Sequence, residues 1–172
     1  MSSTPKGDAA LLSRVRGAIA AAPDANAALT DAVRLLKENL PHYTWAGIYL
    51  MEGDELVLGP YLGKPSPHTR IPLGRGICGA AATERATIIV DDVNNDPRYL
   101  ACSLETRSEI VVPIMRGDTV LGEIDIDSDR PAAFGAADRA LLEAAAALLS
   151  MKLAAEPVEP RRTKQNPVEP AR

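Results

Sequence analysis

The hydrophobic period of the chain changes at Pro41, and this change constrains the fold more than any other feature of the sequence. Before Pro41, apolar residues recur at helical spacing over residues 8–22 and again over residues 26–40. After it, residues 43–51 have the composition of a strand, and residues 55–60 follow a tight turn as its hairpin partner. Helices followed by adjacent hairpins are typical of an α+β fold, in which helices pack on a largely antiparallel sheet.

The remaining expected elements continue this pattern to the end of the last helix. They are a short strand at 69–71, a glycine-rich turn and short helix at 74–83, a strand at 87–90, two strong strands at 108–115 and 119–126, and an amphipathic helix at 135–155. We therefore predict a central, largely antiparallel sheet with helices packed on its faces.

The domain organisation follows from length and composition. With 172 residues, the chain is long enough for one domain with a real hydrophobic core, which we place at residues 8–155. Residues 1–7 are polar, and we expect a flexible N-terminus there. Residues 156–172 alternate prolines with charges, a composition that cannot build a core, so we expect a disordered tail.

Charge and hydropathy exclude several classes of function. The net charge of −4 argues against a nucleic-acid surface, which needs clustered Lys and Arg. No apolar run approaches the roughly 20 residues that span a bilayer, and the N-terminus lacks the pattern of a signal peptide. We expect a cytoplasmic protein with no membrane partner, in which cysteines stay reduced.

The two cysteines, Cys78 and Cys102, are the first candidates for chemistry. Cys102 follows Tyr99-Leu-Ala in an expected loop, where backbone amides can stabilise a reactive thiolate, although a purely structural cysteine remains the alternative. Cys78 lies at the glycine-rich turn, where a buried and a reactive cysteine are equally compatible with the sequence. The cysteines and the two histidines show no paired ligand spacing, so we expect no metal site.

Acidic residues gather on one expected strand. Asp125 and Asp127 are two residues apart, so their side chains point to the same face, and Glu123 extends the row. The alternative is a solvated sheet surface, but an acidic row of this kind is unusual there. Together with Cys102 and Glu109, these acids indicate a pocket for a small cationic molecule with a reducible group.

Two aromatic residues share a face of the first expected strand. Trp45 and Tyr49 are four residues apart, and Gly47 between them leaves room for a ligand to approach. They either pack into the core or line a slot for a methyl group on sulfur, because sulfur packs well on aromatic edges.

Several longer pieces of sequence resemble one protein family. They are Trp45-Ala-Gly-Ile-Tyr49, Leu56-Val-Leu-Gly-Pro-Tyr-Leu-Gly-Lys64, Arg70-Ile-Pro-Leu-Gly-Arg-Gly-Ile-Cys-Gly79, Leu100-Ala-Cys102, Ser108-Glu-Ile-Val-Val-Pro113 and Gly122-Glu-Ile-Asp-Ile-Asp-Ser128. Over residues 26–155 the chain resembles the GAF domains, and among them the free methionine-(R)-sulfoxide reductases.

The resemblance implies a GAF-like fold and specific roles for individual residues. It implies a catalytic cysteine at Cys102 and a second cysteine at Cys78, with no metal and no organic cofactor. The positions that match its substrate pocket are Trp45, Tyr49, Glu109, Asp125 and Asp127. One departure concerns a further cysteine that the family usually carries shortly after Gly-Lys, because residues 63–69 of this chain contain none.

The expected reaction is reduction of free L-methionine-(R)-sulfoxide to methionine by the Cys102 thiolate, through a sulfenic acid. Cys78 is the internal candidate for resolving that sulfenic acid. Otherwise thioredoxin or a small thiol acts on it directly. The alternative is a non-enzymatic GAF module that binds a small ligand or senses oxidants through Cys102. The terminal helices also leave a homodimer open.

Overall fold

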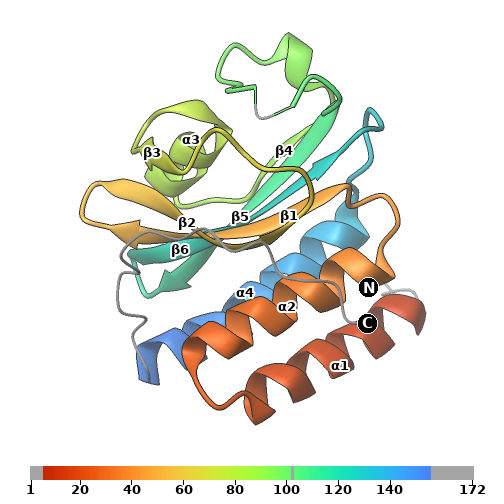
Figure 1. Ribbon diagram of the computed structural model, residues 1–172, viewed down its shortest axis with the longest axis vertical. Coiled ribbons are helices and arrows are strands. Elements are labelled where there is room, and N and C mark those ends of the chain that lie inside the picture. The colour runs from red at the N-terminus through yellow and green to blue at the C-terminus, as the bar shows by residue number, and fades with distance from the viewer. Residues whose placement is uncertain (1–5, 102, 156–172) are drawn as a thin grey trace.

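The structure is a computed structural model that describes residues 6–101 and 103–155 (Figure 1). The elements are α1 (Lys6–Ala21), α2 (Ala25–Asn39), β1 (Trp45–Glu52), β2 (Glu55–Leu62), β3 (Arg70–Pro72), α3 (Gly76–Glu84), β4 (Ile88–Val90), the short 3-10 helix η1 (Val93–Asn95), β5 (Ser108–Arg116), β6 (Thr119–Ser128) and α4 (Ala136–Ala155).

The described residues form a six-stranded sheet in the order β3-β2-β1-β6-β5-β4. Every neighbouring pair is antiparallel, which confirms the predicted α+β class and the antiparallel sheet. The hairpins β1–β2 and β5–β6 pair as expected from their tight turns. The two hairpins join where β1 pairs with β6. This pairing brings the first and last long strands of the chain together at the centre of the sheet.

Helices cover the two faces of the sheet unequally. Helices α1, α2 and α4 lie side by side under one face, whereas α3 lies over the other, beside β3 (Figure 1). The strands alternate accordingly. The side chains that join the core under α1, α2 and α4 include Ala46, Ile48, Ile110, Val112, Ile124 and Ile126. The second core lies between the sheet and α3. It includes Trp45, Tyr49 and Val111 from the strands and Ile77, Cys78 and Ala81 from α3.

The start of α2 shows how local sequence sets an element. Asp24 has extended backbone geometry, and its carboxylate accepts a hydrogen bond of 2.7 Å from the amide of Ala27, so it caps the helix. From there, apolar residues at helical spacing bury one stripe of α2 against the sheet, and the helix ends before Pro41.

Most predicted boundaries differ from the observed ones by one or two residues. β1 begins at Trp45 and not at Tyr43, because Tyr43 belongs to the connection after α2, where its hydroxyl donates to Asp138 over 3.0 Å. β6 runs two residues further than predicted, to Ser128, and α1 begins at Lys6 instead of Asp8. Residues 1–5 and 156–172, where we predict a flexible terminus and a disordered tail, lie outside the described residues, so the division of the chain stays a prediction.

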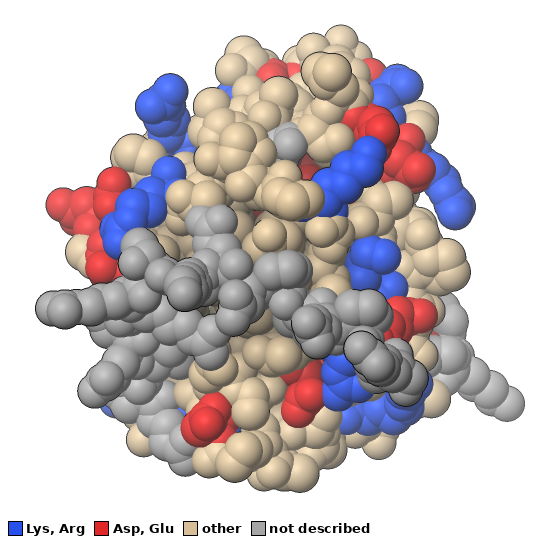
Figure 2. Space-filling model, in the orientation of Figure 1, with Lys and Arg blue, Asp and Glu red and all other residues tan. Residues whose placement is uncertain are grey.

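Surface charge is mixed on the face shown in Figure 2, where Lys and Arg side chains alternate with Asp and Glu and neither sign gathers into one patch. None of the helices formed by the described residues is long and apolar enough to cross a lipid bilayer.

Candidate functional site

Strand register assembles the site on the sheet face beneath α3. Residues that pair across β5, β6 and β1 form three rows, and their side chains share this face. The rows are Glu109, Asp127 and Trp45; Val111, Asp125 and Gly47; and Pro113, Glu123 and Tyr49. The register therefore places three acids of β6 in the centre of the sheet, with Glu109 beside them.

This acidic face is buried. Glu109, Glu123, Asp125 and Asp127 are between 0 and 5% exposed. The solvated sheet surface, the alternative that the sequence left open, is therefore wrong. Four carboxyl groups in one dry region can exist only if protons, hydrogen bonds or a cation compensate their charge.

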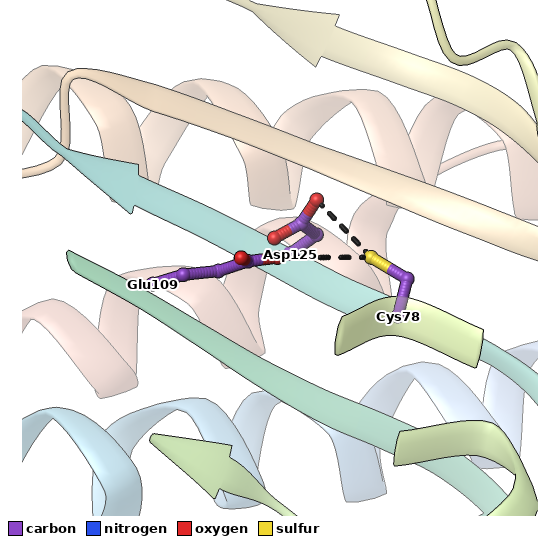
Figure 3. A group of neighbouring side chains, drawn as sticks. All are labelled: Cys78, Glu109 and Asp125. Atoms are coloured by element: carbon purple, nitrogen blue, oxygen red, sulfur yellow. Dashed lines mark hydrogen bonds between the residues drawn. The ribbon is translucent and has the colours of Figure 1, made fainter. Parts of the chain in front are cut away.

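Cys78 joins the acids from α3. Its sulfur lies 3.4 Å from Asp125 Oδ2, to which the thiol donates, and 3.9 Å from Glu109 Oε1 (Figure 3). The three side chains come from α3, β5 and β6 and point toward one another in Figure 3. The glycine-rich start of α3 lets the helix fold closely onto the turn before it, because a Cβ at Gly79 would lie 2.9 Å from the carbonyl oxygen of Pro72. Cys78 is thus both buried and part of the site.

Burial shifts the protonation of the acids. It raises the pKa of Asp125 to about 6, and hydrogen bonds with Glu109 and Cys78 limit that rise. It raises the pKa of Glu109 well above its usual value, and the neighbouring charges of Asp125 and Asp127 add to the rise. These directions fit a protonated Glu109 that donates to an ionised Asp125. The site can therefore hold a negative charge and a transferable proton side by side.

The pKa values of Asp127 and Cys78 are also raised, with burial as the main cause. For Asp127, the charge of Asp125 adds to the rise, while a hydrogen bond with Thr106 opposes it. For Cys78, the nearby carboxylates add to the effect of burial, so the group is held as a neutral thiol.

Glu123, which the sequence placed in the acidic row, is the most completely enclosed acid of the site. Its side chain is fully buried, and neither carboxylate oxygen has a hydrogen-bond partner among the described residues. Burial raises its pKa well above the usual range. The period-2 pattern of β6 placed Glu123 on the acidic face, but only the packing of α3 over that face shows that it is enclosed.

Trp45 covers the part of β1 that pairs with Asp125. Its ring stacks on Tyr61 with centroids 5.6 Å apart, and its Nε1 donates to the carbonyl oxygen of Lys64 over 3.0 Å. A Cβ at Gly47 would lie 2.3 Å from Trp45 Cη2, so the indole itself occupies the space above Gly47 that we expected a ligand to use. That expectation about Gly47 is wrong. Tyr49 is fully buried, and its hydroxyl donates to the carbonyl oxygen of His68 over 2.8 Å.

A cavity of about 160 Å³ opens beside Trp45 and Asp127. Lys64 and Glu105 form an ion pair at this cavity, from the loops after β2 and before β5. Its other lining residues are Thr44, Ser66, Ser103, Thr106 and Asp129. The sequence did not single out Lys64 or Glu105 as site residues, because opposite charges 41 residues apart give no local signal.

Cys102, the predicted nucleophile, lies outside the described residues. The residues on either side of it are described. Ser103 lines the cavity, and the carbonyl oxygen of Ala101 is 3.1 Å from His68 Nε2. Of the predicted site residues, the structure therefore brings Cys78, Glu109, Asp125, Asp127 and Trp45 together. Tyr49 lies on the same face, in the row of Glu123.

Fold and site together define a small α+β domain with an enclosed thiol–carboxylate cluster between its sheet and one short helix. The family model "GAF domain" matches residues 24–153 of this chain. The chain therefore belongs to the GAF domain family, on the branch that contains the free methionine-R-sulfoxide reductases.

Individual relatives support that placement. The free methionine-R-sulfoxide reductase of Saccharomyces cerevisiae is 44% identical over 110 residues, which cover 62% of this chain and 61% of the relative. The protein of the same name from Escherichia coli is 42% identical over 102 residues, which cover 59% of this chain and 61% of the relative. Among solved structures, free methionine-R-sulfoxide reductase from Neisseria meningitidis in complex with its substrate superposes with a TM-score of 0.83. It is 36% identical, and the match covers 90% of this chain and 94% of that one.

Proposed function

We propose that this chain reduces free L-methionine-(R)-sulfoxide to methionine. The observation that carries the proposal is the buried row of Glu109, Asp127 and Trp45, which lies next to Asp125 on the sheet face beneath α3. Burial raises the pKa of these carboxyl groups, so a negative charge and a transferable proton can be held there together. Relatives named free methionine-R-sulfoxide reductase, at 36 to 44% identity, support the same reaction.

Substrate selection follows from the charge of the site. The ionised carboxylate of Asp125 binds the α-ammonium group of the free amino acid, with the other acids of the row around it. A methionine sulfoxide within a peptide lacks that ammonium group. If it occupied the site, the buried negative charge of Asp125 would have no positive partner. The indole of Trp45 provides an apolar surface for the methyl group on sulfur.

The chemical step is a thiol-dependent removal of oxygen. The Cys102 thiolate attacks the sulfoxide sulfur, and a protonated carboxyl group, Glu109 or Asp127, gives its proton to the sulfoxide oxygen. The sulfur–oxygen bond of the substrate then breaks as the oxygen passes to the Cys102 sulfur, and the sulfur–sulfur bond formed in the attack breaks with it, which leaves Cys102 as a sulfenic acid. The cysteine sulfur loses two electrons, the sulfoxide gains them, and methionine leaves as the thioether.

The enzyme then has to return to the thiol form. Attack of a second thiol on the Cys102 sulfenic acid gives a disulfide and water. Within the chain that thiol is Cys78, and the disulfide is then reduced by thioredoxin or a small thiol. A homodimer and a cytoplasmic location remain part of the proposal.

The proposal is tested with the full-length protein and a dithiol reductant. We expect methionine to form from the free R epimer, with at least tenfold lower catalytic efficiency for the N-acetylated sulfoxide, because acetylation removes the ammonium charge. Cys102→Ser should abolish the reaction. If the protein binds methionine sulfoxide without converting it, the alternative of a ligand-binding or oxidant-sensing GAF module replaces the reductase.

A further inference from the structure

We propose that the cluster of Cys78, Glu109 and Asp125 binds a thiophilic divalent cation of the zinc class, with Glu123 beside it, and that this cation competes with the substrate. The binding site is argued from the cluster alone. The competition rests on the proposed function, because it requires Asp125 to be the residue that holds the substrate ammonium group.

The geometry of the three side chains matches a metal site. One ligand atom from each residue lies within 4.8 Å of the others. A tetrahedral zinc ion with bonds of about 2.3 Å to sulfur and about 2.1 Å to oxygen separates these atoms by about 3.6 Å. The distances from Cys78 Sγ are 3.4 Å to Asp125 Oδ2 and 3.9 Å to Glu109 Oε1, which bracket that value. The side chains need little rearrangement to converge on one ion (Figure 3).

A second observation points to a ligand at the same place. Both carboxylate oxygens of Glu123 and Oδ1 of Asp125 are buried without a hydrogen-bond partner among the described residues. Glu123 also lies beside the cluster, because it shares the face of β6 with Asp125 and its carboxylate is close enough to raise the pKa of the Cys78 thiol. Buried, unpartnered oxygens of this kind are costly, and a coordinated cation would compensate all three. Glu123 can supply the fourth ligand directly or through a water molecule.

The substrate ammonium group does not account for the whole cluster. An ammonium ion donates hydrogen bonds to carboxylate oxygens, but it gains little from a thiol that donates to Asp125 itself. Zinc-class ions bind thiolate, with carboxylate oxygens as further ligands, so they use Cys78 and the acids together. Binding displaces the protons of Cys78 and Glu109 into solvent. The ligands lie 31 and 47 residues apart in sequence, which explains why spacing gave no indication of a metal site.

The experiment uses Co²⁺ as the probe, added to the reduced full-length protein. We expect one Co²⁺ per chain and a near-ultraviolet charge-transfer band from thiolate to cobalt, which Zn²⁺ abolishes by displacement. Because the chain has two cysteines, Cys102→Ser leaves Cys78 as its one thiol, so a band in that variant assigns the sulfur without changing Cys78. Glu123→Gln should weaken Co²⁺ affinity by about tenfold or more, the usual effect of losing a supporting carboxylate. Glu143→Gln, on the exposed side of α4, is the matched control and should leave the affinity unchanged.

Three results would overturn the site: no charge-transfer band in the wild type, no band in Cys102→Ser, or equal Co²⁺ affinity for Glu123→Gln and the wild type. Competition is measured separately, by adding methionine-(R)-sulfoxide to the cobalt complex. The band should fall as the substrate rises, and a band unaffected by a substrate that the enzyme converts would refute the competition. A band in a protein without reductase activity would support the metal site while the proposed function fails.

Discussion

Asp125 lies directly opposite Gly47 in the pairing of β6 with β1, and the indole of Trp45 covers that glycine. The aromatic surface and the central carboxylate of the site are therefore held in place by the same backbone pairing. A Cβ at position 47 would come within 2.3 Å of Trp45 Cη2 and 3.0 Å of Tyr61 Cβ. A glycine therefore leaves the space that the indole fills while it stacks on Tyr61.

Gly47→Ala should displace Trp45 and weaken substrate binding. We expect a loss of about 1–3 kcal/mol in the free energy of unfolding, typical of overpacking, together with a raised KM. Urea unfolding and steady-state kinetics measure the two effects. Gly17→Ala is the matched control, because a Cβ there meets nothing within 4 Å in the middle of α1. It should stabilise the protein by about 0.5–1 kcal/mol. Unchanged kinetics in Gly47→Ala would show that Trp45 does not contact the substrate.

Asp125→Asn and Asp127→Asn should each lower kcat/KM by about tenfold or more, the usual scale for groups that bind charge or transfer protons. The amide keeps the size of the side chain but loses the charge and the transferable proton. Asp118→Asn, in the exposed turn between β5 and β6, is the control and should behave as the wild type. Normal turnover in both site variants would show that these acids serve structure alone.

The buried acids should make the protein less stable as pH rises. Burial raises the pKa of Asp125 from 3.8 to about 6, so the folded protein binds this proton more tightly than the unfolded chain. The contribution of Asp125 to stability is present below about pH 4 and is lost as pH rises through about 6. At about 1.36 kcal/mol per pKa unit, that loss is about 3 kcal/mol.

Asp125→Asn removes this titration. Its stability relative to the wild type should therefore improve as pH rises from about 4 to about 8, when both are unfolded by urea at a series of pH values. A stability difference that does not vary with pH would mean that Asp125 titrates normally.

Cys78 should resolve the oxidised nucleophile slowly. Burial raises its pKa well above the usual value, so the reactive thiolate is scarce, although Asp125 is placed to accept its proton. After one turnover without reductant, mass spectrometry should show a gradual conversion of the Cys102 sulfenic acid to a Cys78–Cys102 disulfide. In Cys78→Ser the sulfenic acid should persist and react with a small thiol. A sulfenic acid equally persistent in the wild type would assign resolution to an external thiol.

Local sequence was sufficient to predict the helices and strands, and to predict which side chains of β6 share a face. The two-residue spacing of Asp125 and Asp127 predicted that they share a face, and the tight turns predicted the hairpins β1–β2 and β5–β6. These features depend on backbone geometry within about ten residues, where periodicity and turn chemistry are informative.

The contacts between distant segments could not be predicted from local patterns. The pairing of Trp45 with Asp127, and the approach of Cys78 to Asp125, join residues far apart in the chain. They depend on how the two hairpins meet and on where α3 packs, and neither has a signature in local periodicity. The enclosure of Glu123 follows from the same packing, which is why it was recognised only as a member of an acidic row.

The alternation of β6 gives this strand two separate tasks that share one backbone. Ile124 and Ile126 anchor it to the helices, while Asp125 and Asp127 face α3. An insertion or deletion of a single residue within β6 would exchange these sets, burying carboxylates among α1, α2 and α4 and placing isoleucines in the site. The number of residues in β6 is therefore more strictly constrained than the identity of any one of its side chains. Substitutions can tune the chemistry or the core one position at a time, but a change in residue number would lose both at once.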